Sequence, residues 1–98
     1  MRPSKPIKFR VTRDIHAAIT DAPVSLSHAL RSGILETVPE DILRPAGRED
    51  DRTRRVHVST RLGAAHIAKL QSLADDLGIT CAEVCARVIE REARRWAR

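Results

Sequence analysis

The sequence predicts a small, mostly helical protein in which two short strands are each followed by two helices. Polar and apolar residues alternate over residues 7 to 12 and 56 to 62, as they do in strands with one buried face. After each strand the apolar residues recur at helical spacing, and Pro23 or Gly78 interrupts the helical region. Only Phe9 and Trp96 are aromatic among the 98 residues, so we expect a thin aliphatic core shared by paired units.

The second half of the chain, residues 54 to 98, shows this pattern most clearly. In "RRVHVSTRLG" one set of strand residues is mostly apolar and the other set is polar. We expect Val58, Thr60 and Leu62 to face inward, because they would meet the helices that follow. The outward set is then His57, Ser59 and Arg61.

Two helices are predicted after this strand. The first has an apolar face and ends at Gly78, a residue typical of the position after a helix. Thr80 is predicted to cap the second helix, with Glu83 completing a capping box. The two apolar faces are Ile67, Leu70, Leu73, Ala74 and Leu77, then Cys81, Val84, Cys85, Val88, Ile89 and Trp96.

Residues 5 to 38 repeat this order in a weaker form. Aligning Val11 with Leu62 matches the two strands, provided that the first helix of this half is about one turn shorter. Ser25 is predicted to cap the second helix, whose apolar face would be Leu26, Leu30, Ile34 and Val38. Residues 39 to 53, with five acids, would form a linker, with a turn of helix near residues 40 to 43. The alternative is that the first half is not a true repeat, so that the amino-terminal basic segment is an arm and the second half forms a homodimer through residues 55 to 62.

The positive charge is concentrated in two stretches. The formal net charge is +5, and residues 1 to 13 and 54 to 61 contain Lys and Arg without a single acid. Such clustering favours a polyanionic partner over a uniformly solvated basic surface, which is the simpler alternative. The alternating Glu90, Arg91, Glu92, Arg94, Arg95 and Arg98 are instead interpreted as a solvated helix face.

The arrangement resembles the ribbon-helix-helix family of DNA-binding proteins. The resemblance is carried by the order and spacing of "RRVHVSTRL", "GAAHIAKLQSLADDLG" and "ITCAEVCARVIEREARRW", and it is weaker over residues 5 to 38. It implies that two strands pair as an antiparallel ribbon, which four helices cover on one face. A tandem chain of this kind would be a pseudo-dimer whose ribbon enters the major groove of DNA.

The resemblance assigns two groups of candidate DNA contacts. The outward strand residues would contact base edges: Lys8, Arg10, His57, Ser59 and Arg61, with Pro6 in the place equivalent to His57. Helix starts and flanking cations would contact phosphates: Ser25, Thr80, Lys5, Arg54 and Arg55. Solvation of the strand face and simple helix capping are the alternatives for the two groups.

The resemblance implies sequence-specific binding to double-stranded DNA, most simply as a transcriptional repressor of a bacterium, plasmid or phage, with possible self-association on DNA. An accessory role in plasmid transfer or partition, or an antitoxin-like protein-interaction role, is the alternative. We expect a cytoplasmic protein with no membrane segment, no cofactor, no metal, no small-molecule substrate and no enzymatic activity, because no catalytic or phosphate-loop motif is present. Cys81 and Cys85 are interpreted as reduced core thiols.

Overall fold

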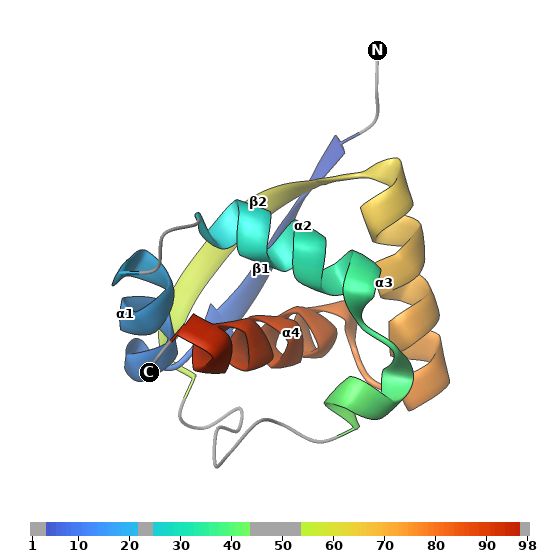
Figure 1. Ribbon diagram of the computed structural model, residues 1–98. Coiled ribbons are helices and arrows are strands. Elements are labelled where there is room, and N and C mark those ends of the chain that lie inside the picture. The colour runs from blue at the N-terminus through green and yellow to red at the C-terminus, as the bar shows by residue number, and fades with distance from the viewer. Residues whose placement is uncertain (1–3, 22–24, 44–53, 97–98) are drawn as a thin grey trace.

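The computed structural model describes residues 4–21, 25–43 and 54–96, apart from the side chains of residues 4, 5, 95 and 96 (Figure 1). Within these residues the chain forms a two-stranded sheet, four α-helices and a short 3-10 helix. In chain order the elements are β1 (Ser4–Val11), α1 (Arg13–Asp21), α2 (Leu26–Glu36), η1 (Pro39–Ile42), β2 (Val56–Gly63), α3 (Ala64–Leu77) and α4 (Cys81–Trp96). The predicted class, mostly helical with a two-stranded antiparallel sheet, is confirmed.

The sheet, which we call the ribbon, pairs β1 with β2 in antiparallel orientation. The register runs from Ser4 opposite Gly63 to Val11 opposite Val56. The predicted strand parity is confirmed, because Phe9, Val11 and Leu62 are almost fully buried on one face. Each strand supplies the hydrogen-bonding partner that the other lacks, although the two are far apart in the sequence.

The helices cover the inner face of the ribbon. In Figure 1, α2 and α4 cross in front of the two strands, while α1 and α3 lie at opposite ends. The core between the layers is aliphatic, as expected from a sequence with so few aromatic residues. Its fully buried large aliphatic side chains are Val11, Leu30, Ile34, Ile42, Leu62, Leu70, Leu73, Val84, Val88 and Ile89.

Helix α4 buries charged side chains as well as its apolar face. Glu90 and Glu92 are 0% and 4% exposed, so the prediction that this part of α4 is a solvated face is wrong for both residues. Glu90 is buried because Arg54 supplies a charged partner from before β2. Glu92 lies against the backbone of Gly33 on α2, where the absence of a side chain lets the two helices approach.

The helix ends follow the predicted caps. Gly78 ends α3 with φ 66°, in the left-handed conformation that glycine adopts without strain. At the starts of α2 and α4, Ser25 Oγ accepts from the His28 amide and Thr80 Oγ1 from the Glu83 amide, both at 3.1 Å. Thr12 Oγ1 caps α1 in the same way by accepting from the Ile15 amide, although no cap was predicted at this position.

Helix α2 ends earlier than predicted. It stops at Glu36, and Val38, expected on its apolar face, lies beyond the helix and is exposed. Pro39 gives the reason, because a proline disfavours helical backbone at the residue before it. The chain then forms η1, which packs on α4 through the buried Ile42, so the first residues of the expected linker belong to the packed structure.

Candidate nucleic-acid interface

The outward face of the ribbon carries the side chains that were predicted to contact bases. Lys8, Arg10, His57, Ser59 and Arg61 are all exposed, as is Pro6. The register brings them together in three facing pairs: Lys8 opposite Ser59, Arg10 opposite His57 and Pro6 opposite Arg61. This face therefore contains three cationic side chains and no acidic one.

The inner face explains why these side chains point outward. Phe9 lies between Lys8 and Arg10 in β1, and Thr60 between Ser59 and Arg61 in β2, and both are buried. Thr60 also hydrogen-bonds through its hydroxyl to Ser27 of α2, so its polar atom has a partner inside the protein. A shift of one residue in either strand would bury charged side chains, which fixes the orientation of the outward face.

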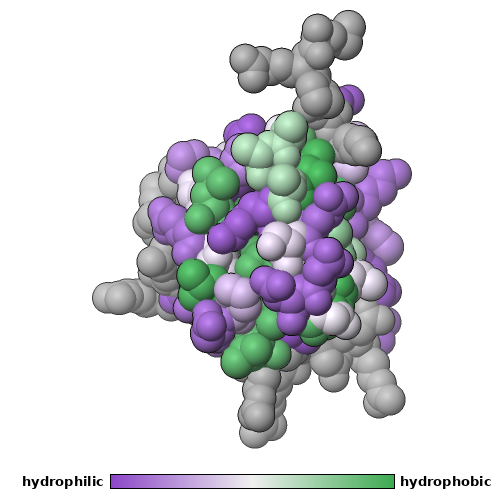
Figure 2. All heavy atoms as spheres, turned by 90° about the vertical axis from the view of Figure 1, so that its right-hand side faces the viewer, coloured by the Kyte–Doolittle hydropathy of each residue, from purple (hydrophilic) through white to green (hydrophobic). Residues whose placement is uncertain are grey.

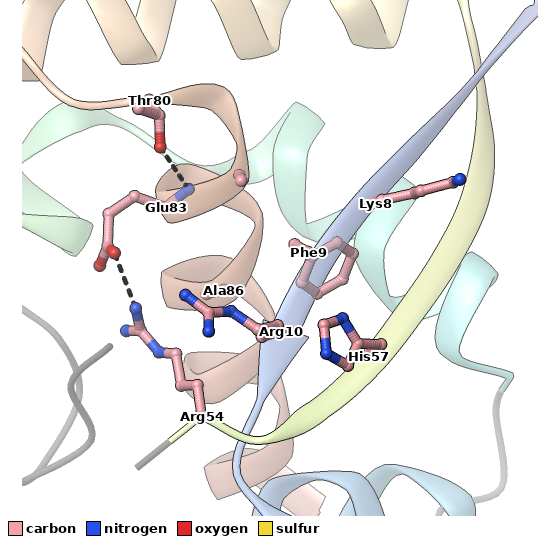
Figure 3. Close-up of a pocket in the computed structure, with 9 residues that line it drawn as sticks. Lys8, Phe9, Arg10, Arg54, His57, Thr80, Glu83 and Ala86 are labelled. Atoms are coloured by element: carbon pink, nitrogen blue, oxygen red, sulfur yellow. Dashed lines mark hydrogen bonds and ion pairs between the residues drawn. The ribbon is translucent and has the colours of Figure 1, made fainter. Parts of the chain in front are cut away.

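The start of α4 lies beside this face. A hollow of about 320 Å³ is lined by residues of the ribbon and of the start of α4, and Figure 3 shows Arg10 extending into it from β1. Two alanines of α4, Ala82 and Ala86, leave this space because their side chains are short. The lining residues are Lys8, Phe9, Arg10, Arg54, His57, Thr80, Ala82, Glu83 and Ala86.

The electrostatics of the hollow favour an anion. Its one acidic lining residue, Glu83, accepts hydrogen bonds from two guanidinium groups, Arg54 Nη1 at 2.7 Å and Arg87 Nε at 2.9 Å. The first backbone amides of a helix lack acceptors within the helix and carry the positive end of its dipole. At α4 these amides belong to Cys81 and Ala82, and Ala82 lines the hollow together with Lys8 and Arg10.

Arg54 does not take the position predicted for a phosphate contact. Its side chain is 2% exposed, and its Nε and Nη2 donate to the Glu90 carboxylate at 2.7 and 3.0 Å. Burial alone would lower the pKa of this guanidinium, but the hydrogen bonds and charges of Glu90 and Glu83 outweigh burial and raise the pKa above its usual range. Arg54 is therefore a buried cation that joins the start of β2 to α4, and its assignment as a phosphate contact is corrected.

The other predicted phosphate contacts divide into two groups. Ser25, Arg55 and Thr80 are exposed in the structure, and the two helix-start residues also serve as caps. The side chain of Lys5 lies outside the part of the chain that the structure describes. The phosphate-binding role of all these residues stays a prediction.

The acidic partners of Arg54 were not predicted from the sequence. Glu83 was assigned to a capping box, but both of its carboxylate oxygens accept from arginine side chains. The available signal was the spacing of Glu83, Arg87 and Glu90 at i, i+4 and i+7, which places them on one side of a helix. No local pattern could have paired them with Arg54, because 29 and 36 residues separate it from the two acids.

The cysteines lie in the core side of α4. Burial, and next the neighbouring Cys81, raise the pKa of the Cys85 thiol to about 12. Both cysteines are free thiols, Cys85 buried and Cys81 partly exposed. Among the residues that the structure describes, no group of three or more His, Cys, Asp or Glu side chains is placed to hold a metal ion.

No described helix combines the length and the hydrophobicity needed to cross a membrane. Comparisons with protein-family models, with curated proteins and with solved structures found no match for this chain.

Proposed function

We propose that this chain binds double-stranded DNA with the outward face of its ribbon in the major groove. The observation that carries the proposal is the composition of that face. Six exposed side chains in facing pairs include Lys8, Arg10 and Arg61 and no acid, in a chain that contains 13 acidic residues. A two-stranded ribbon fits the major groove, where arginine and lysine can donate to guanine.

The start of α4 supports the same proposal from a second direction. The hollow is lined by Lys8 and Arg10 of β1 and by Thr80 and Ala82 at the start of α4. A DNA phosphate bound there would lie next to a ribbon that occupies the groove, and such contacts fix the register of a protein on DNA. Thr80 would then cap α4 and face the phosphate at the same time.

We further propose that the two halves of the chain are copies that form a pseudo-dimer. Helix α4 packs on β1 and α1 as well as on α3 of its own half, and α2 packs on β2 and α3, so the second helix of each half covers elements of the other half. This exchange is what a two-fold axis through the ribbon would produce. The shorter α1, with nine residues against fourteen in α3, agrees with the gap that the sequence alignment needs.

Selection of duplexes from a random DNA pool at near-physiological salt tests the proposal. We expect the purified chain to enrich one motif, and Arg61→Ala to lose about 1 to 3 kcal/mol of discrimination at one base position. Arg31→Ala, which removes an exposed arginine from α2, is the matched control and should retain the preference. Absence of enrichment by the folded wild-type chain would contradict DNA recognition by the ribbon.

Transcriptional repression is the role that we propose for this binding, because a protein held in the major groove at a promoter blocks access to it. An accessory function in plasmid transfer or partition would use the same face. These roles differ in where the DNA site lies, and mapping the enriched motif onto the source genome distinguishes them.

A second candidate function is binding of a protein partner. Three large apolar side chains at the end of α2 and around η1 are exposed, Leu35 at 55%, Val38 at 47% and Leu43 at 61%. By contrast, apolar side chains on the face that carries α3 lie between polar ones without forming one continuous patch (Figure 2). Replacing Leu35 and Leu43 with Ser should remove partner capture if this group is an interface, and should leave DNA selection unchanged.

A further inference from the structure

The register of the ribbon defines where a two-fold axis between the halves would pass. Aligning Val11 with Leu62 makes each β1 residue from 5 to 11 equivalent to the β2 residue 51 positions later. Lys8 is thus equivalent to Ser59, and the register places these two residues directly opposite each other. An axis through this pair exchanges the two strands, and the alignment drawn from sequence agrees with the pairing found in the structure.

The same axis sorts the outward side chains into equivalent positions. It exchanges Arg10 with Arg61, so both halves present an arginine at the same distance from the centre. It also exchanges His57 with Pro6, and it leaves Lys8 and Ser59 at the centre. The outward face therefore has a symmetric part, the two arginines, and an asymmetric part made of the other four residues.

The chemistry of the four asymmetric residues differs strongly between the halves. Lysine only donates hydrogen bonds, whereas serine both donates and accepts. A histidine ring can donate or accept, whereas a proline side chain does neither. A base pair beside His57 or Ser59 is therefore recognised by different groups from the equivalent base pair beside Pro6 or Lys8.

Resting on the proposed function, we infer that the chain recognises an imperfect palindrome and binds it in one orientation only. Arg10 and Arg61 would each contact one of two guanines related by the axis, since arginine donates in bidentate fashion to guanine O6 and N7. Lys8, Ser59, His57 and Pro6 would select unlike bases at the centre and at the two flanks. A homodimer with identical strands has no such preference, because turning it by 180° leaves every contact unchanged.

The decisive experiment makes the two outward faces identical. In the double variant Pro6→His with Lys8→Ser, both strands present His, Ser and Arg in the same order. Both substitutions are at exposed positions, so circular dichroism should report an unchanged fold. Duplex selection with the wild-type chain should give a motif with inverted guanines and unlike flanks, and selection with the double variant should give a true palindrome.

Arg31→Ser controls for the loss of one positive charge, and its motif should match that of the wild-type chain. A palindromic motif from the wild-type chain, or an asymmetric motif from the double variant, would overturn the inference while leaving DNA binding intact. Failure of the folded wild-type chain to select any duplex would overturn the proposed function and the inference with it.

A second pair of variants tests the inference even if the double variant binds poorly. Arg10→Ala and Arg61→Ala should each lose about 5- to 150-fold in preference for guanine, and the two losses should fall at opposite ends of the motif. Losses at the same base position, or at neither guanine, would show that these arginines are not related by the axis.

Discussion

Replacing Arg54 with Ala is expected to lower the free energy of unfolding by about 3 to 5 kcal/mol, because it removes the positive partner of a buried carboxylate. The Arg54 side chain donates three hydrogen bonds of 2.7 to 3.0 Å, two to Glu90 and one to Glu83. Glu90 is fully buried, so water cannot replace the lost guanidinium there without opening the contact between α4 and the start of β2.

The magnitude follows from how differently the two acids are solvated. Hydrogen bonds to charged groups contribute about 1.5 to 3 kcal/mol each. Three full contributions would therefore lower the free energy of unfolding by an amount at or above the upper end of the range expected for Arg54→Ala. Glu83 reduces the sum, because its side chain is 22% exposed and keeps its ion pair with Arg87. The remaining loss of stability comes mainly from Glu90. Removing one partner of a buried ion pair costs about 3 to 5 kcal/mol, because the other charge stays buried without compensation.

Urea denaturation followed by circular dichroism measures this effect. Arg55→Ala is the matched control, because the neighbouring Arg55 is exposed and its replacement should change the free energy of unfolding by no more than about 0.5 kcal/mol. The double variant Arg54→Met with Glu90→Leu should recover much of the loss, since it removes both buried charges together. Equal unfolding midpoints for Arg54→Ala and Arg55→Ala, with weaker DNA binding by the former, would refute the buried ion pair and restore Arg54 as a phosphate contact.

Three other predictions concern single positions. Gly33→Ala should destabilise the fold by about 1 to 3 kcal/mol in urea denaturation, because an added Cβ would lie 2.6 Å from Val88 Cγ1, and an unchanged midpoint would contradict this close approach. Gly78→Ala should cost about 1 kcal/mol from its φ of 66° alone, since nothing lies within 4 Å of the added atom, and a larger loss would reveal a packing role. Cys85 should stabilise the protein fully below the ordinary thiol pKa of 9.0 and lose this contribution as the pH rises through about 12, so Cys85→Ala should flatten the alkaline decline in stability. An identical decline in both proteins would contradict burial of this thiol.

The strands and helix faces could be predicted from the sequence because they depend on local periodicity. Phe9, Val11 and Leu62 alternate with polar residues, and a period of two leaves only one parity that buries the apolar set. Leu70 and Leu73 follow the helical period in the same way. Gly78 and Thr80 were predictable for a related reason, since the ends of a helix need particular backbone angles or side-chain acceptors at fixed positions.

The buried charges of α4 could not be predicted by the same means. A pattern such as "EREARR" is typical of a solvated helix face, and its amphipathic period is indistinguishable from one that pairs with a distant cation. The partner of Glu90 is Arg54, which only tertiary folding brings to α4. The early end of α2 is different, because Pro39 was visible in the sequence and disfavours helical backbone at Val38.

The ion pairs around α4 also affect how charge is distributed over the surface of the protein. Arg54, Arg87 and Arg91 use their guanidinium groups on Glu83, Glu90, Asp41 and backbone or hydroxyl oxygens within the fold. The acids of α4 are thereby held by arginines on the core side and the η1 side of the molecule, and the outward face of the ribbon has no acid of its own. An anion approaching the ribbon consequently meets cations without a competing carboxylate in the same strands. Charge reversal on α4 should therefore lower the free energy of unfolding, whereas charge reversal at Lys8 or Arg61 should weaken DNA binding. Urea denaturation and duplex selection on the same variants can separate these two effects.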